Sequence, residues 1–483
     1  MSLFSYQYTK AGVVLDQLMD IIQAAPGWGS HLSYVNSADD TYDIFFDVEL
    51  TAEEQLALSA IVENFVAVKY STTLVYDAIV GSKYTGDYQS VADAFDAGHT
   101  TLYVRDGIYM ETRNIVMPNY GSITGESGGN VVISFMGAAN GIVADGSGGA
   151  KETAGTISVE KNTRNVVGVG TTFTNIPLAE AFILLGINHY KVRAIIDATH
   201  LELDDVYVGT SLENIPYRLL NMRTGIKLEK LIIVGSASYA VYMRACRHLV
   251  LDSVSCKSNA LNYHLVDCGD SAVHRVLSET CAGAGLGLVD CNSMVLNTLN
   301  IYNNMGHGVS LSGQLESVLF VGCESSNNGG CGMFNAADSQ EVSFVNCVVK
   351  SNESHGIHVG SSGSGSIISS TTSSLNGGCG IHVESSRSSI INNISSNNAA
   401  AGIYLKCAES CVLGNILCDN TVSGVTVEGS DNIVKSNIVR GSASGVEVVA
   451  GSVDSMICYN NLKSNTASLS DSGTGTDSSG NKI

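Results

Sequence analysis

The sequence is poor in several residue types that mark common protein classes. Among 483 residues it has one Trp, Trp28, four Pro, and 25 Lys and Arg against 46 Asp and Glu, a formal net charge of −21. Binding phosphates requires Lys and Arg, so this balance argues against nucleic acid and anionic membranes as partners. No run of about 18 apolar residues occurs, and residues 1–9 form neither a basic nor an apolar segment, so we expect no membrane insertion and no signal peptide.

The cysteines lack the spacing of a metal site. All 13 lie between Cys246 and Cys458, and no Cys-x-x-Cys pair occurs among them. An odd number, with pairs such as Cys268 and Cys291 separated by one repeat, indicates reduced and packed thiols, with a few bridges as the alternative. No calcium loop or zinc spacing is visible, so we expect no metal and no cofactor.

Glycine is abundant, with 51 residues, and it opens a repeated phrase of glycine, apolar residue, variable residue and apolar residue. The copies, one of them weaker at 332–335, are separated by 21 to 24 residues. This period suits one coil of three short strands and is too short for a helix pair. The copies are Gly285–Leu288, Gly308–Leu311, Gly332–Asn335, Gly356–Val359, Gly380–Val383, Gly402–Leu405, Gly424–Val427 and Gly445–Val448.

Asparagine recurs with the same period. Asn393, Asn415 and Asn437 each precede an isoleucine, and residues that recur in this way stack about 4.8 Å apart on neighbouring strands. Stacked amides can pass hydrogen bonds along the column. Together with the glycine phrases, they predict a mainly β protein, a right-handed single-stranded parallel β-helix of roughly 10 to 12 coils.

Changes in composition and periodicity predict five segments. Residues 1–80 form a small α+β head with helices over 13–22 and 51–65, and Val91 to Phe95 suit a short helix that covers the first coil. Short strands between turn residues in 150–220 predict an inserted antiparallel β-barrel or sandwich module. The segments are 1–80, the head or attachment domain; 81–149, the first coils with their capping helix; 150–220, the insertion; 221–463, the main β-helix; and 464–483, a polar C-terminal coil.

Two stretches carry a resemblance to a known family. Residues 90–94 (SVADA), followed by 102–109 (LYVRDGIY), resemble the first coil of the pectate-lyase-like β-helix superfamily, which includes bacteriophage tailspikes. The insertion is similar to small β modules of phage tail and fibre proteins. The resemblance implies a virion protein that is assembled in the host cytoplasm and attached to other virion proteins through its N-terminal domain. It also implies a homotrimer that binds host-surface polysaccharide.

The resemblance transfers no catalytic residue. Lyase-like members of the superfamily use Lys or Arg with calcium near the coil face, and no matching cluster stands out in these repeats.

The variable positions of the phrases, beginning with Lys227 of the similar phrase at 225–228, are predicted to form an outward column along one face. A polymer lying along this face would meet aromatic rings for stacking and histidines able to move protons, for which we single out His358 and His382. The same residues suit an ordinary solvated surface, because opposite charges on neighbouring strands are mildly favourable. The proposed ligand-binding residues are Phe334, Glu384, Tyr404, Lys406, Glu428 and Glu447.

A second candidate site is a carboxylate pair. Asp267 and Asp290 occupy matching positions one coil apart, which would bring their carboxylates to about 5 Å, the separation of a retaining glycosidase pair. Close carboxylates raise one pKa and so retain a proton for acid catalysis. The alternative is that each aspartate accepts backbone hydrogen bonds at a turn.

Three functions remain open from the sequence. The first is a virion protein of the tailspike or fibre kind that binds host-surface polysaccharide. The second is a polysaccharide depolymerase, a glycosidase or lyase, on the same scaffold, and the third is a head or tail decoration protein without carbohydrate activity. A periplasmic or surface protein of a cell is disfavoured because no signal sequence is expected.

Overall fold

The computed structural model describes residues 4–9, 32–38, 41–46, 48–52, 54–55, 58, 76–82, 85–136, 140–146, 154–175, 181–185, 188–336 and 338–483. None of the helices in these ranges is long and apolar enough to cross a membrane. Trp28 and the helix expected over 13–22 lie outside the described residues.

The described part of the head is a small antiparallel sheet. It has the strand order β1-β3-β2 and comprises β1 (Phe4–Thr9), β2 (Leu32–Ala38) and β3 (Thr41–Phe46). Next in the chain, the backbone N–H of Thr51 donates to Glu54 Oε2 at 2.8 Å, and the N–H of Glu54 donates to Thr51 Oγ1 at 3.3 Å. This reciprocal cap is the start expected for the helix over 51–65, most of which lies outside the described residues.

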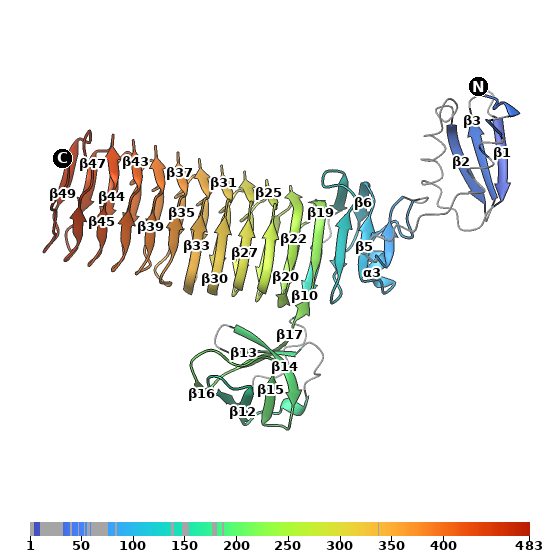
Figure 1. Cartoon of the computed structure of the whole chain (residues 1–483), viewed down its shortest axis with the longest axis horizontal. Helices are drawn as coiled ribbons and strands as arrows, with labels where there is room; N and C mark the ends of the chain where they lie inside the picture. Colours follow the sequence, from blue (N-terminus) through green and yellow to red (C-terminus); the bar gives the residue numbers. More distant parts are fainter. Residues whose placement is uncertain are drawn as a thin grey trace.

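The larger body is a solenoid whose strands stack coil upon coil along the long axis in Figure 1. One face is a 13-stranded parallel sheet with one strand per coil. In chain order these strands are β7 (Ile115–Val116), β10 (Ile142–Asp145), β20 (Tyr239–Arg244), β23 (Leu261–Val266), β26 (Leu286–Val289), β29 (Val309–Ser312), β32 (Met333–Asn335), β35 (Ile357–Val359), β38 (Ile381–Val383), β41 (Ile403–Leu405), β44 (Ser423–Val427), β47 (Ser444–Val448) and β49 (Ala467–Asp471).

The other faces belong to a 26-stranded sheet, which contributes two strands to each regular coil. Its strands are β4 (Ala78–Val80), β5 (Thr101–Val104), β6 (Gly107–Glu111), β8 (Ser122–Gly125), β9 (Val131–Phe135), β18 (Arg223–Thr224), β19 (Lys227–Val234), β21 (Cys246–Arg247), β22 (Val250–Lys257), β24 (Gly269–His274), β25 (Leu277–Glu279), β27 (Asn292–Asn297), β28 (Asn300–Tyr302), β30 (Gln314–Val321), β31 (Glu324–Ser326), β33 (Asp338–Val345), β34 (Val348–Lys350), β36 (Ile367–Ser369), β37 (Thr372–Ser374), β39 (Ser389–Ile391), β40 (Ile394–Ser396), β42 (Cys411–Leu413), β43 (Ile416–Cys418), β45 (Ile433–Lys435), β46 (Ile438–Arg440) and β48 (Met456–Cys458).

The expected right-handed parallel β-helix is therefore confirmed. Thirteen strands in the one-per-coil sheet make it somewhat longer than the ten to twelve coils expected from the glycine phrases. Five of these strands lie outside the eight glycine phrases: β7, β10, β20 and β23 precede residue 285, and β49 follows residue 448.

A close contact inside the coil explains why each phrase begins with glycine, as Gly380 illustrates. In β38, Ile381 and Val383 are fully buried, while His382 between them points outward. A Cβ at Gly380 would lie 2.1 Å from Ser395 Oγ, a hydroxyl that donates to the carbonyl of Gly402 at 2.8 Å. Glycine is needed at this position because the serine hydroxyl occupies the space that a side chain would fill.

Two columns of buried asparagines run along the solenoid. The predicted column is confirmed: Asn393 Nδ2 donates to Asn415 Oδ1, and Asn415 Nδ2 to Asn437 Oδ1, both at 3.0 Å. A second column lies on the opposite side of the β37–β40–β43 stack of strands. Its members are Asn304, Asn328, Asn352, Asn376, Asn398 and Asn420, joined by amide-to-amide hydrogen bonds.

Short corners join the two strands that each coil contributes to the 26-stranded sheet. Between β39 and β40 the chain turns at Asn392, with φ 55°, and the next coils turn at Gly414 and Ser436, with φ 67° and 59°. One residue in the left-handed region reverses the side-chain alternation, so both flanking strands direct apolar residues into the core.

The first coil is closed by α3 (Val91–Asp96), as expected. Ser90 caps this helix, and Val91, Ala92, Ala94 and Phe95 are buried against the solenoid core. This cover protects backbone groups that would otherwise form an open sheet edge.

The inserted module is a seven-stranded antiparallel sheet beside the solenoid (Figure 1). It comprises β11 (Thr156–Val159), β12 (Asn165–Val169), the 3-10 helix η3 (Phe173–Asn175), β13 (Ala181–Leu185), β14 (Asn188–Ile195), β15 (His200–Leu203), β16 (Leu212–Ile215) and β17 (Arg218–Asn221). The module has its own hydrophobic core. Phe182 also packs with Met222 and Ala245, which connects the module to the solenoid.

All 13 cysteines are free, and all but the half-buried Cys411 are buried. Burial raises the pKa of the Cys268 and Cys291 thiols well above the ordinary value. These cysteines are packing residues, as the sequence indicated.

Candidate functional site

The outward column exists on the 13-stranded sheet. Strand pairing places the variable residues of successive phrases in register, one above the other: Tyr242, His264, Gly287, Ser310, Phe334, His358, His382, Tyr404, Thr426 and Glu447. The phrase at 225–228 was expected to begin this column. It belongs instead to the other sheet, where Lys227 lies on β19 and pairs with β8 and β22.

Rings on this face stack into a continuous ladder, which we define as His307, Phe334, His355, His358, His382 and Tyr404. His307 stacks on Phe334 with centroids 4.5 Å apart, and His358 on His382 at 4.6 Å. Phe334 and His358 are 5.2 Å apart, and Tyr404 meets His382 edge-on at 4.8 Å. The faces of His307 and Phe334 cover each other, as do those of His358 and His382, whereas the other contacts are tilted or edge-on.

His307 and His355 were missed in the sequence analysis because they lie in the bend before a phrase. Each one directly precedes a phrase glycine, and that was the available signal. His307 Nδ1 accepts the backbone N–H of Cys331, and His355 Nδ1 that of Cys379, both at 2.9 Å. Each histidine therefore connects its coil to the next one.

The bond to Cys379 determines the tautomers of the neighbouring histidines. A neutral His355 whose Nδ1 accepts must carry its proton on Nε2, which lies 3.4 Å from His382 Nδ1. His382 then carries its own proton on Nε2, 3.4 Å from Glu384 Oε1. Among the described residues, however, this buried Nε2 has no hydrogen-bond partner, so the ordered donors end at His382.

The ladder is held neutral. Burial, followed by the charges of His358, His355 and Lys406, lowers the pKa of His382 from 6.5 to about 3. Burial also lowers the pKa of His307, His355 and His358. At neutral pH these imidazoles are uncharged groups that donate and accept hydrogen bonds.

Charged residues flank the ladder two positions further along the strands. Lys406 Nζ lies 3.8 Å from Glu384 Oε1, and the Tyr404 hydroxyl donates to Glu428 Oε2. Glu447 continues the column one coil beyond Thr426. The predicted ligand-binding residues thus share one face, with three carboxylates against one ammonium.

The three histidines His355, His358 and His382 also resemble a metal site, since one ring nitrogen of each lies within 4.8 Å of the others. Zn–N bonds of about 2.0 to 2.1 Å require ligand atoms about 3.4 Å apart. In addition, His355 Nδ1 accepts a backbone N–H, and its Nε2 carries the proton. It therefore offers no lone pair, and the cluster does not fit a three-imidazole metal centre.

The carboxylate pair lies at coil corners. Asp267 and Asp290 have φ of 52° and 53°, and both follow strands of the 13-stranded sheet. Asp267 Oδ2 accepts a hydrogen bond from Arg218 of the module at 3.2 Å, and Asp290 Oδ1 accepts the N–H of Gln314 at 2.9 Å. Both carboxylates thus have structural partners, and a catalytic role for the pair stays a prediction.

Two family models match parts of the chain. The model described as right handed beta helix region matches residues 219–372. The model described as periplasmic copper-binding protein (NosD) matches residues 335–482. The second range contains the three histidines whose geometry does not fit a metal centre. No curated protein matches the chain.

Solved structures with similar folds include two phage tailspikes and an epimerase. The tailspike of Pseudomonas phage phi297 is 11% identical, with 80% of this chain and 72% of that chain covered and a TM-score of 0.43. The tailspike from Pseudomonas phage LKA1 is 13% identical, with 79% and 73% covered and a TM-score of 0.44. The A-module of the Azotobacter vinelandii mannuronan C-5 epimerase AlgE6 is 14% identical, with 80% and 92% covered and a TM-score of 0.38. The chain itself has the right-handed parallel β-helix fold.

Proposed function

We propose that the ladder face binds an extended host-surface polysaccharide and that the protein serves as a virion tailspike or fibre. The observation that carries this proposal is the register of the ring ladder, which places Phe334, His358, His382 and Tyr404 one above the other on successive coils of one face. A linear polymer lying parallel to the solenoid axis meets these groups in succession. Attachment to other virion proteins through the head, and assembly as a homotrimer, belong to the same proposal.

The charges on this face indicate the kind of polymer. The histidines are neutral, and Glu384, Glu428 and Glu447 outnumber Lys406, so a polyanionic chain would be repelled. Neutral or amino-bearing sugars fit better, because their hydroxyl and amino groups donate to the carboxylates while Lys406 donates to their oxygens. Because the faces of His358 and His382 cover each other, recognition relies on hydrogen bonds more than on the sugar stacking that the sequence suggested.

Binding is tested with immobilised bacterial capsular polysaccharides, both neutral and acidic, and the purified full-length chain. We expect a neutral or amino-bearing polymer to be retained, and the double variant Tyr404→Ala, Lys406→Ala to weaken its binding at least about tenfold, or about 1.4 kcal/mol. Lys435→Ala, on β45 of the other sheet, is the matched control and leaves binding unchanged. Equal binding by all three proteins would contradict the ladder as the site, and the absence of any bound polymer would favour a decoration protein.

Cleavage is the second candidate activity, because the imidazole of His382 and the carboxylate of Glu384, groups able to transfer protons, lie 3.4 Å apart on the same face. Light scattering of the polymer after incubation distinguishes the two functions. If the unaltered protein shortens the polymer and the folded variant His382→Ala does not, the protein is a depolymerase that acts at the ladder. If cleavage is lost in Asp267→Asn or Asp290→Asn instead, the chemistry takes place at the carboxylate pair. If no protein shortens the polymer, the ladder face binds without cleaving.

A further inference from the structure

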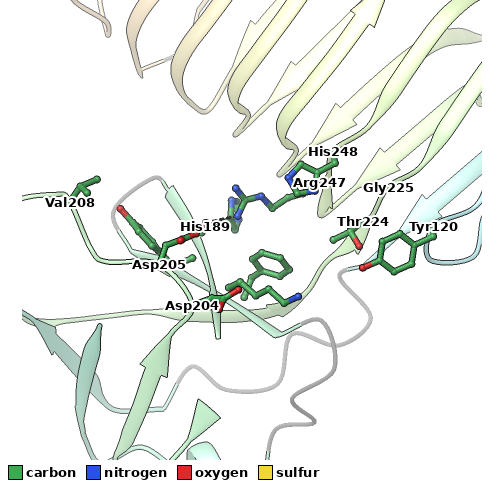
Figure 2. Close-up of a pocket in the computed structure, with 12 residues that line it drawn as sticks. Tyr120, His189, Asp204, Asp205, Val208, Thr224, Gly225, Arg247 and His248 are labelled. Carbon is green, nitrogen blue, oxygen red and sulfur yellow. Dashed lines mark hydrogen bonds between the residues drawn. The ribbon is translucent and has the colours of Figure 1, made fainter. Parts of the chain in front are cut away.

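A cavity of about 480 Å³ lies where the inserted module meets the solenoid. Figure 2 shows Tyr120, Thr224, Arg247 and His248 on the solenoid side and His189, Asp204 and Asp205 on the module side. The volume is within the range of about 300 to 1,000 Å³ that small-molecule pockets occupy, and junctions between domains are a common place for them.

In the part of the chain that the structure describes, several polar side chains at this cavity make no hydrogen bond. Among the described residues, no hydrogen bond or ion pair involves the side chains of Lys191, Asp204, Asp205 or His248, although all four line the cavity. In the wall, both ring nitrogens of His189 are buried without a hydrogen-bond partner. Arg247 differs from these residues, since it donates to the carbonyl of His189 at 2.6 Å and pairs with Asp270.

The residues that line the cavity include both acidic and basic side chains. Asp204 and Asp205 face the same space as Lys191, and burial with nearby cations lowers the pKa of His189 to about 4. Burial and the charges of Arg247 and Lys191 likewise lower the pKa of His248. Both imidazoles are thus neutral at pH 7. A simple anion would meet the carboxylates and a simple cation the ammonium, so neither is favoured.

A polyhydroxylated ring suits such a lining, because each hydroxyl donates to one group and accepts from another. The cavity also offers an aromatic surface. Tyr120 is 57% exposed, and a Cβ at Gly225 would lie 2.7 Å from its Cδ1. The glycine therefore leaves room for the tyrosine ring, which also lines the cavity. An exposed tyrosine beside carboxylate and ammonium groups is able to stack on a sugar while they hold its hydroxyls.

We infer that this cavity is a saccharide-binding site for an uncharged mono- or disaccharide unit, separate from the ladder face. Tyr120 stacks on the sugar, Asp204 and Asp205 accept its hydroxyls, and Lys191 donates to its oxygens. The ligand joins the module to the solenoid, since its contacts come from both. The inference stands on the cavity alone and does not depend on polymer binding at the ladder.

The test is saturation-transfer NMR of the full-length protein with galactose, N-acetylglucosamine and maltotriose as probes. We expect signal from at least one probe, which falls at least about fivefold in Tyr120→Ala and in Asp204→Asn. Tyr459→Ala, which alters another exposed tyrosine in a C-terminal coil, keeps the signal and serves as the control.

Loss of signal in Tyr404→Ala with retention in Tyr120→Ala would overturn the inference by moving the binding site to the ladder. Absence of signal from all three probes, or stronger protection by inorganic phosphate than by any sugar in a thermal-shift comparison, would also overturn it. Near-ultraviolet circular dichroism of each variant confirms that the module is folded. If Tyr120→Ala does not fold, the more conservative Asp204→Asn provides the test.

Discussion

Replacing Asn398 with leucine lowers the free energy of unfolding by an expected 3 to 5 kcal/mol, roughly the loss of several buried hydrogen bonds. Asn398 Oδ1 accepts from both the backbone N–H and Nδ2 of Asn376, and its own Nδ2 donates to Asn420 Oδ1 and to the carbonyl of Ser373. Leucine fills the volume and satisfies none of these groups. Each of them is buried, so no water replaces the lost partner.

Guanidinium unfolding followed by circular dichroism measures the effect, and hydrogen exchange locates it in the coils around residues 373–420. The adjacent Asn397 provides the matched control. It is exposed, with φ 56°, so Asn397→Gly keeps the corner geometry and should change stability by no more than about 0.5 kcal/mol. Similar losses in the two variants would show that the column contributes little beyond the corner.

Acidification from pH 7 to pH 4 is the second change with a large expected effect. The folded protein keeps His382 neutral down to about pH 3, whereas the unfolded chain binds a proton near pH 6.5. A lowered basic pKa therefore costs no stability at pH 7 and an increasing amount as the pH falls below 6.5. Allowing for partial exposure of the ladder, we expect His382 to account for up to about 2 kcal/mol at pH 4.

Melting temperatures across this pH range test the expectation. His382→Gln should flatten the acid side of the profile, because glutamine cannot take up the proton. The groups that face His382 are His355, His358, Tyr404, Glu384 and Lys406. His274→Gln, on β24 of the other sheet, should leave the profile unchanged. If His382→Gln loses stability below pH 6.5 as steeply as the unaltered protein, titration of carboxylates dominates the loss of stability at low pH.

Periodicity was sufficient to predict most of the fold. The phrase glycines and Asn393, Asn415 and Asn437 recur at one-coil spacing, and a one-residue slip would expose their buried neighbours, so the register is strongly specified. The second asparagine column was missed because its members, such as Asn398, lie within Ser- and Asn-rich segments that read as ordinary bends. A local pattern does not distinguish a solvated bend from one whose amide points inward.

Two features of the ladder face were not predicted from the sequence. Lys227 satisfied the phrase pattern but lies on the other sheet, and Gly225 has φ 66°, a left-handed corner that the pattern alone does not reveal. His307 and His355 reach the ladder from bends, so strand alternation placed no constraint on them. The cavity at the module junction brings together residues more than 100 positions apart in the sequence. A periodic pattern does not predict contacts between such distant residues.

The stacking of the coils also determines how the solenoid responds to mechanical load. Each regular coil is bonded to the coil before it and the coil after it, as in the succession β35, β38, β41 and β44. Tension applied at the end of the chain would therefore detach one coil at a time at a modest and nearly constant force. Shear across the stack would have to break many rows of hydrogen bonds at once. The solenoid is therefore expected to resist shear more strongly than tension at its end.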